Sequence, residues 1–391
     1  MHVAQISFFT DPHGRTPEQL LHDWPTLVDV AEAASRANVR VSVVQACPHS
    51  QHVCRNGVNY CFLPFGRGAS TRTGANLGEL LRKLAPDVLH VQGLGFAHDV
   101  LSLAEIVPGI PIMVQDHADR PPRLWRRPLW RRGLSVVSGI AFCSLRQAQP
   151  FANAGLIHPQ TRVYEIPEST SRFVPGDKEQ ARRTLGLSGE PLVLWVGHLD
   201  SNKDPLTVFD GIGRAARTLP KLKLYCCFGK APLMRAIERR LAHDPRLGDR
   251  VHLLGAVPHD KIEHLMQAAD FFVLGSHREG SGYSLIEALA CGLPPIVTDI
   301  PSFRSITCSG QVGALWPTGD AHKLSECLVS LAARPQLEMR AHARAHFERE
   351  LSFDAVGRKL ALAYQDLLAR RRSYCPQDRQ RTEGTHNAQL G

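Results

Sequence analysis

Residues 271–298 read Phe-Phe-Val-Leu-Gly-Ser-His-Arg-Glu-Gly-Ser-Gly-Tyr-Ser-Leu-Ile-Glu-Ala-Leu-Ala-Cys-Gly-Leu-Pro-Pro-Ile-Val-Thr. The apolar run Phe271–Leu274 predicts a buried strand, and the pattern Tyr283–Cys291 predicts a helix that ends before Gly292. Pro295–Thr298 predicts the next strand. A strand, a helix and a strand in this order form a βαβ unit, so the stretch predicts a parallel sheet covered by helices.

The same alternation of strand and helix patterns runs along most of the 391 residues, in two successive series. It predicts an α/β protein with two Rossmann-like, doubly wound domains that face one another across a deep cleft, where ligands bind. We expect a first domain over 1–174, a linker over 175–190 and a second domain over 191–350. A C-terminal helix is expected over 351–373, crossing back to the first domain or packing elsewhere, and the polar tail 374–391 is expected to be disordered.

The turn between the strand and the helix of the opening stretch carries polar groups suited to a ligand. The first turn of a helix has unpaired N–H groups and the positive end of the dipole, so it can receive a phosphate. Gly280 and Gly282 let the backbone approach that ligand closely. Glu279 can accept hydrogen bonds from sugar hydroxyls, and Glu287, two turns along, suits a ribose diol. The alternative is a solvated loop and helix surface without a ligand.

Two glutamates eight positions apart around a Gly-x-Gly turn resemble the signature of the group 1 family of retaining glycosyltransferases with the GT-B fold. The resemblance covers nearly the whole chain and is strongest over 192–304. It implies a retaining, metal-independent hexosyltransferase that uses a UDP- or GDP-type nucleotide-sugar as a co-substrate and needs no cofactor. It also implies a glycan or lipid-linked acceptor, as in the synthesis of cell-surface polysaccharide or glycolipid. The sequence contains no Asp-x-Asp motif.

A second motif, Gly-His-Leu-Asp-Ser-Asn-Lys over 197–203, follows the predicted strand Leu192–Val196. Enzymes of this family usually have an arginine and then a lysine here, and both contact the donor diphosphate. Lys203 stands in the place of the lysine, whereas His198 replaces the arginine. A neutral histidine offers one donor where arginine offers a permanently charged fork, so this departure weakens the expected grip on the diphosphate.

The first domain contributes less specific signals. In similar enzymes a histidine just past the strand Ile112–Gln115 reaches the transferred sugar, which makes His117 the candidate, with Asp116 able to orient its imidazole. A histidine that only caps the next turn is the alternative. The family often has a Gly-Gly pair after the first strand, but this chain has only Gly14 beside Arg15.

The resemblance therefore divides the candidate site residues into two groups. The expected catalytic residues are His117, Lys203 and Glu279. The expected donor-binding residues are Gly14, Arg15, His198, Gly280, Ser281, Gly282, Tyr283 and Glu287. Lys203 and His198 would stabilise the departing diphosphate, while Glu279 and His117 would hold the sugar. No metal ligand is expected.

A formal net charge of +9 indicates an acidic partner. The segment Arg120–Arg132 holds six arginines around Trp125, Leu129 and Trp130, which is typical of a helix on an anionic membrane surface. A surface helix whose tryptophans pack into the first domain is the alternative. No nucleic-acid-binding motif is present, so nucleic acid is not an expected partner.

Composition sets the remaining expectations. An apolar share of 43% with 21% charged residues is ordinary for a soluble globular protein. No signal peptide is recognisable, and no apolar stretch reaches the ~20 residues that a transmembrane helix needs. We therefore expect a cytoplasmic protein, peripheral at the inner membrane surface if the arginine-rich segment binds there. A cysteine and histidine cluster over 47–54 matches no standard zinc spacing, so no zinc site is expected there. No two cysteines are spaced Cys-x-x-Cys and no secretion signal is recognised, so reduced thiols are expected.

Two other classes of function stay open at this stage. The replacement of arginine by His198 and the missing glycine pair are compatible with a catalytically weak protein that binds sugar-nucleotides or acts as a membrane-associated scaffold. A nucleotide-sugar epimerase of the same fold would use Lys203 and Glu287 equally well. These residues therefore do not separate the alternatives.

Overall fold

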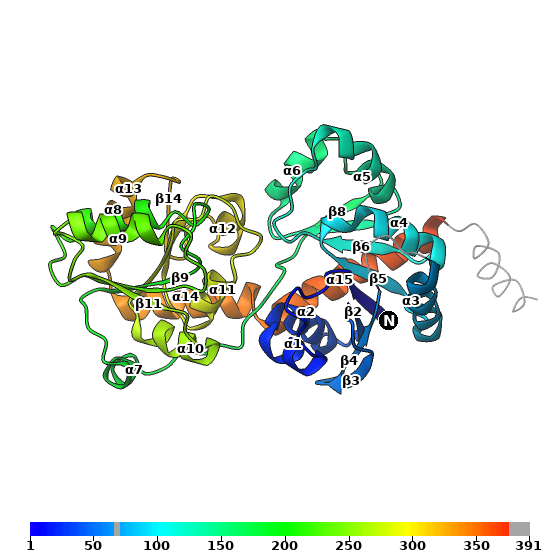
Figure 1. Ribbon diagram of the computed structural model, residues 1–391, viewed down its shortest axis with the longest axis horizontal. Coiled ribbons are helices and arrows are strands. Elements are labelled where there is room, and N and C mark those ends of the chain that lie inside the picture. The colour runs from blue at the N-terminus through cyan, green and yellow to red at the C-terminus, as the bar shows by residue number, and fades with distance from the viewer. Residues whose placement is uncertain (66–70, 375–391) are drawn as a thin grey trace, which may run out of the picture. The chain divides into compact units, whose positions relative to one another are not determined.

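The computed structural model describes residues 1–65 and 71–374, and the side chains of 1–65 and 76–371. The chain divides into two compact units (Figure 1). The first comprises Met1–Ile166 together with the chain from Val356 onward, and the second comprises Pro167–Ala355. Among the described residues, no helix has the length and apolar character to span a membrane.

The first unit is built on an eight-stranded sheet in the order β3-β4-β2-β1-β5-β6-β7-β8. All neighbours are parallel except β3, which pairs antiparallel with β4. The strands are β1 (His2–Ser7), β2 (Arg40–Ala46), β3 (Gln51–Arg55), β4 (Val58–Leu63), β5 (Val88–Gln92), β6 (Ile112–Gln115), β7 (Gly139–Phe142) and β8 (Arg162–Glu165). The helices are α1 (Pro17–Asp23), α2 (Pro25–Arg36), α3 (Thr71–Leu84), η1 (Leu94–Phe96), α4 (Ala97–Ile106), η2 (Leu124–Arg126), α5 (Arg127–Leu134), α6 (Leu145–Asn153) and α15 (Phe353–Tyr374).

Glycine allows two close helix contacts in the first unit. A Cβ on Gly133 of α5 would lie 2.0 Å from the carbonyl oxygen of Ala97, at the start of α4. A Cβ on Gly357 of α15 would lie 2.1 Å from the carbonyl oxygen of Ala33 in α2. These approaches fix α5 on α4 and α15 on α2, because any side chain would push the backbones apart.

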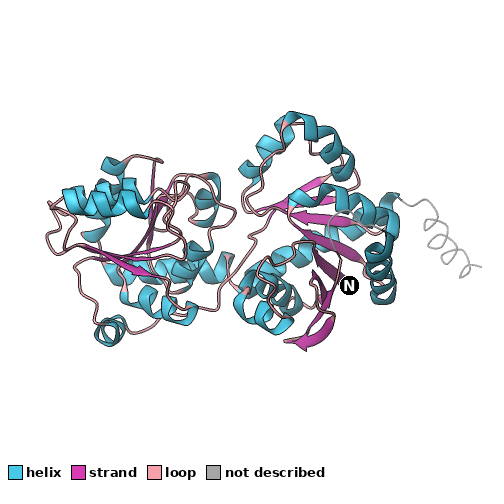
Figure 2. Cartoon of the chain, viewed as in Figure 1, coloured by secondary structure: helices cyan, strands magenta, loops and turns pink. Residues whose placement is uncertain are grey.

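The second unit has a fully parallel six-stranded sheet in the order β11-β10-β9-β12-β13-β14. Helices lie on both faces of each sheet (Figure 2). Its strands are β9 (Leu192–Val196), β10 (Lys223–Cys227), β11 (Val251–Gly255), β12 (Phe271–Leu274), β13 (Pro295–Thr298) and β14 (Ala314–Trp316). Its helices are α7 (Lys178–Leu185), α8 (Pro205–Ala215), α9 (Met234–His243), α10 (His259–Ala268), α11 (Tyr283–Ala290), α12 (Pro301–Ile306), α13 (Ala321–Ala332) and α14 (Gln336–Glu350).

Each sheet has a point where the strand order reverses. In the second unit the chain runs outward from β9 through β10 to β11, then returns to place β12 on the other side of β9. In the first unit β2 and β5 lie on opposite sides of β1. Loops that leave neighbouring strands at such a switch point diverge and leave a crevice at the carboxyl edge of the sheet.

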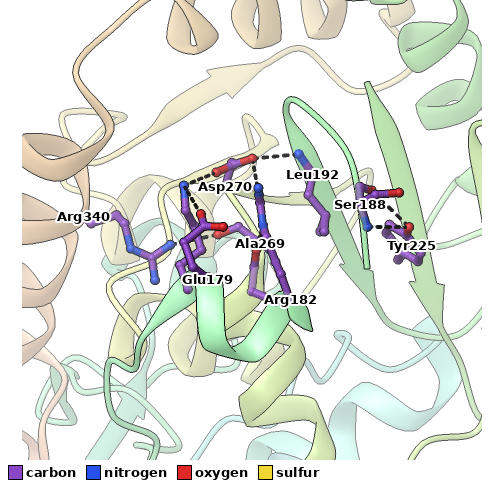
Figure 3. Close-up of polar contacts among 10 residues, drawn as sticks. Glu179, Arg182, Ser188, Leu192, Tyr225, Ala269, Asp270 and Arg340 are labelled. Atoms are coloured by element: carbon purple, nitrogen blue, oxygen red, sulfur yellow. Dashed lines mark hydrogen bonds and ion pairs between the residues drawn. The ribbon is translucent and has the colours of Figure 1, made fainter. Parts of the chain in front are cut away.

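The unit boundaries differ from the predicted ones. The segment predicted as a linker, 175–190, belongs to the second unit, where α7 packs against α10. The Asp270 carboxylate accepts hydrogen bonds from Lys178 Nζ at 3.0 Å, Arg182 Nη2 at 2.7 Å and the Leu192 amide at 2.8 Å (Figure 3). Asp270 is 6% exposed, so two cations of α7 bind a buried carboxylate of the second unit. This segment is therefore packed on the second unit and is not a free linker.

Near the N-terminus, α1 and α2 are separate helices, because Trp24 ends α1 and Pro25 begins α2. The C-terminal helix begins at Phe353 and belongs to the first unit from Val356 onward. The tail predicted over 374–391 lies outside the described residues apart from Tyr374.

Candidate active site

Two loops meet at the switch point of the second unit. The loop after β9 spans 197–204 and the loop after β12 spans 275–282. The His277 amide donates to the Asn202 carbonyl at 2.7 Å, and Asn202 Nδ2 donates to the Arg278 carbonyl at 3.0 Å. A Cβ on Gly275 would lie 2.9 Å from the Lys203 carbonyl oxygen, so glycine there lets the loops touch. The two predicted motifs therefore form one structure.

Lys203 and Glu279 form an ion pair across these two loops. Their side chains are 17% and 13% exposed, so the pair is largely shielded from water. The Lys203 amide donates to the Asp200 carboxylate at 2.9 Å, which fixes the loop that carries the lysine. An ammonium group has three donors, so Lys203 can hold Glu279 and still donate to an incoming anion.

Glu168, which no sequence motif indicated, shapes the glycine-rich turn. Its carboxylate accepts a hydrogen bond from the Ser281 amide at 2.7 Å, and its own amide donates to Ser281 Oγ at 3.0 Å. Gly282 adopts a φ of +74°, and a Cβ there would lie 2.6 Å from the Phe303 ring. The amide of Ser281, a residue expected to bind the donor, is thus engaged by a buried carboxylate. Ser281 holds the turn in shape.

Glu287 also has a partner that the sequence did not reveal. His259 Nε2, at the start of α10, lies 2.5 Å from Glu287 Oε1 on α11. The Glu287 side chain is 14% exposed and that of His259 is 58% exposed. The His259 ring packs on Phe173 at 4.9 Å between centroids. This contact orients the carboxylate while its other oxygen can serve a diol.

His198 is exposed at the end of β9. Its Nδ1 accepts a hydrogen bond from the Lys230 amide at 3.2 Å, so the neutral ring carries its proton on Nε2. Partial burial lowers the pKa of His198, with neighbouring lysines acting in the same direction. The imidazole is therefore neutral near pH 7 and offers one N–H donor, as the replacement of arginine suggested.

His117 lies in the first unit, where it joins the loops after β5 and β6. Its Nε2 donates to Gln92 Oε1 at 2.9 Å. The Asp119 carboxylate accepts from the Leu94 amide at 2.8 Å. The Asp116 carboxylate accepts from the amides of Ala118 and Asp119, at 3.3 and 3.0 Å, and so supports the turn beside the histidine. Gln92 therefore positions the imidazole.

Gly14 and Arg15 lie in the loop after β1 of the same unit. Arg15 donates to both oxygens of the Asp11 carboxylate, at 2.8 and 3.2 Å. These hydrogen bonds lower the pKa of Asp11 to about 2. Gly14 has a φ of +65°, which glycine adopts readily. Arg15 can therefore bind an anion only by sharing its charge with Asp11.

A cavity and the cysteine and histidine cluster lie away from these residues. A cavity of about 710 Å³ opens at the amino ends of β6, β7 and β8, the sheet edge opposite to His117. Arg162 and Arg370 line it, and both pair with Asp366, at 3.4 and 3.2 Å. Among the described residues, which include the whole cysteine and histidine cluster over 47–54, no group of three or more His, Cys, Asp or Glu is placed to hold a metal ion.

Comparison with known proteins finds a match to a family model within the second unit. Residues 177–346 match the model for "Glycosyl transferases group 1". A GDP-mannose:cellobiosyl-diphosphopolyprenol alpha-mannosyltransferase of Xanthomonas campestris is 28% identical over 234 residues, which are 58% of this chain and 59% of the relative. A D-inositol 3-phosphate glycosyltransferase of Geodermatophilus obscurus is 28% identical over 209 residues, 51% of this chain and 46% of that protein. The matches thus span about three-fifths or less of these relatives' length.

Solved structures show the fold of the whole described chain. A sucrose-phosphate synthase from Thermosynechococcus elongatus matches with a TM-score of 0.69 and 19% identity, covering 94% of this chain and 99% of that one. Anabaena HepE in complex with UDP matches with a TM-score of 0.70 and 16% identity, over 94% and 100% of the two chains. The expected GT-B class, with two Rossmann-like units, is confirmed. Over residues 177–346 the chain therefore resembles the group 1 glycosyltransferases.

Proposed function

We propose that this protein transfers a hexose from a UDP- or GDP-sugar to a glycan or lipid-linked acceptor, in the synthesis of cell-surface polysaccharide or glycolipid. The observation that carries the proposal is the Lys203–Glu279 ion pair at the switch point of the second sheet. Such a point is where doubly wound sheets bind nucleotides. One solved relative in fold is a complex with UDP, and one curated relative is named for GDP-mannose.

In the proposed reaction the leaving group is a nucleoside diphosphate, so negative charge grows on its phosphate oxygens as the sugar bond breaks. Lys203 donates to this charge, and His198 adds the Nε2–H donor described above. Glu279 accepts hydrogen bonds from the sugar and Glu287 from the ribose diol. The donor lies against the backbone of the turn, which is formed by Gly280, Gly282 and Tyr283.

We further propose that the transfer retains the configuration at the anomeric carbon and proceeds without a metal, as the family resemblance implies. The acceptor attacks on the face that the diphosphate leaves, through an oxocarbenium-like transition state. His117 is assigned to the transferred sugar's hydroxyls, and Gly14 with Arg15 to the donor diphosphate. The reaction is assigned to the cytoplasmic side of the inner membrane. These residue roles rest on the resemblance and on the loops that carry them.

A second candidate is a sugar-nucleotide-binding protein with weak catalysis. It is favoured by the neutral His198 and by the engagement of Arg15 with Asp11, because both reduce the positive charge available to a leaving diphosphate. An epimerase would bind the same donor but return a different sugar nucleotide, so product analysis separates it from a transferase.

The test combines binding and turnover. Lys203→Met is expected to weaken UDP or GDP binding roughly 10- to 100-fold in calorimetry, since a charge-assisted hydrogen bond contributes about 1.5–3 kcal/mol. Uridine or guanosine alone should bind the variant as it binds the wild type. Glu279→Gln is expected to reduce sugar transfer at least tenfold while leaving nucleoside diphosphate binding intact.

The matched control is the exposed Lys323–Glu326 pair on α13. Lys323→Met and Glu326→Gln change the same charges away from the site and should leave both measurements unchanged. Equal diphosphate affinity for Lys203→Met and Lys323→Met would overturn the proposed donor site. Unaltered turnover in Glu279→Gln would instead favour the binding protein.

A further inference from the structure

The arginine-rich segment of the first unit forms η2 and α5, and its backbone is fixed by buried anchors. Trp130 is 8% exposed and Leu134 is 1% exposed, both within the core of this unit. Gly133 packs on the Ala97 carbonyl, where no Cβ fits. Arg131 donates to the carbonyls of Ala154 and Gly155, at 3.0 and 3.1 Å. These contacts anchor the backbone of the segment to the first unit.

Three large apolar side chains of the same segment are exposed to solvent. Leu124 and Trp125 are each 71% exposed, and Leu129 is 44% exposed. The Arg123 guanidinium lies 5.3 Å from the Trp125 ring centroid. Single exposed apolar residues are common, but three within six residues of one rigid segment mark an interaction surface. We call Leu124, Trp125 and Leu129, with the arginines around them, the Trp125 surface.

The charge around this surface has one sign. Arginine occupies positions 120, 123, 126, 127, 131 and 132, and no aspartate or glutamate occurs from Arg120 to Tyr164. Five of these arginines are exposed, and Arg127 is half-buried. Local sequence therefore supplies no carboxylate to neutralise them. A partner that suits the surface must present anionic groups at the rim and an apolar interior a few ångströms deeper.

We propose that the Trp125 surface docks the protein on an anionic lipid bilayer. Tryptophan and leucine enter the boundary between head groups and acyl chains, while the arginines pair with lipid phosphates. A nucleic acid would match the charge but would leave Leu124 and Leu129 without a role. The inference goes beyond the proposed reaction, and it would bring the enzyme to a lipid-linked acceptor. Trp130, which the sequence grouped with Trp125, belongs to the core instead.

The test is co-sedimentation of the full chain with vesicles of phosphatidylcholine alone or with about one quarter phosphatidylglycerol. We expect the wild type to partition at least tenfold more strongly onto the anionic vesicles, with less binding at high salt. Leu124→Ser with Trp125→Ser should lower that partition about tenfold or more. Leu337→Ser with Leu362→Ser is the matched control, because these leucines are 82% and 65% exposed elsewhere. It should bind as the wild type does.

Two further measurements keep the outcome decisive. Circular dichroism melting should show equal stability for both double variants, since all four leucine and tryptophan positions are exposed. Lipids with brominated acyl chains should quench tryptophan fluorescence in the wild type and much less in Trp125→Phe. Equal vesicle binding by the two double variants would overturn the proposal, as would retention on RNA that the serine substitutions leave unchanged. UDP or GDP titration of the serine variant should match the wild type, so this test stands apart from that of donor binding.

Discussion

Glu168 and Ser281, 113 residues apart in the chain, exchange two hydrogen bonds: carboxylate to amide at 2.7 Å and amide to hydroxyl at 3.0 Å. Glu168 is 5% exposed and Ser281 is fully buried. Ser281 lies in the turn between Glu279 and the start of α11. Glu168, which is distant in the sequence, therefore fixes the conformation of that turn. The geometry of the donor site depends on this reciprocal pair.

Replacing Glu168 tests that dependence. Glu168→Ala leaves the buried Ser281 amide without its acceptor, which costs about 1–3 kcal/mol of stability. We expect a lower urea midpoint and roughly tenfold weaker UDP or GDP binding, because the turn no longer holds its shape. Glu168→Gln keeps an oxygen acceptor and should retain most of both properties. Equal behaviour of the alanine and glutamine variants would show that the hydrogen bond does not govern the turn.

His259 is predicted to act on the donor through Glu287. His259→Ala should raise KM for the nucleotide-sugar about tenfold with little change in kcat, because the carboxylate loses the donor that orients it. The same substitution should not weaken binding of a 2′,3′-dideoxy nucleoside diphosphate, which lacks the ribose diol. His264→Ala, on the same helix, is the control and should alter neither ligand. An equal loss of affinity for the nucleotide-sugar and for the dideoxy nucleotide would show that His259 has a structural role only.

His198 predicts a pH dependence of donor affinity. Its pKa is lowered, so it is neutral above its usual value near ~6.5 and becomes charged only as the pH falls below that value. A nucleotide-sugar carries no phosphate that titrates near pH 6, so its affinity should rise as the pH is lowered from 7.5 to 5.5. His198→Gln should give a flat and weaker profile, and His198→Arg a flat and tighter one. An identical slope in wild type and His198→Gln would place the titrating group elsewhere.

Asp270 is predicted to hold the segment that the sequence suggested as a linker. Asp270→Ala removes the carboxylate from Arg182, whose side chain is 14% exposed, and from the Leu192 amide. Leaving a buried charge unpaired costs about 3–5 kcal/mol, which a fall in the urea midpoint of the second unit should report. Glu190→Gln breaks the Glu190–Lys221 pair, whose side chains are 70% and 69% exposed, and should cost less than about 1 kcal/mol. A similar loss of stability in Asp270→Ala and Glu190→Gln would show that Asp270 does not hold this segment.

The sequence by itself determined the two doubly wound units and most of the strands, because apolar runs, helical periodicity and glycine or proline breaks are local signals. It also placed Lys203 and Glu279 on loops at the carboxyl ends of strands, and Glu287 on the helix that follows the second loop. Glu279 and Glu287 both belong to one strand–turn–helix unit. Their relative position therefore does not depend on how the rest of the chain packs.

Only the tertiary structure decided which distant residues contact and orient the site residues. Glu168 with Ser281 and His259 with Glu287 come from segments 113 and 28 residues apart, and no local pattern encodes which carboxylate or imidazole arrives. Periodicity could not separate Trp125 from Trp130 either, since a 3₁₀ turn precedes α5 and changes the register of the exposed face. The sequence determined the elements, whereas long-range packing decided their partners and their exposure.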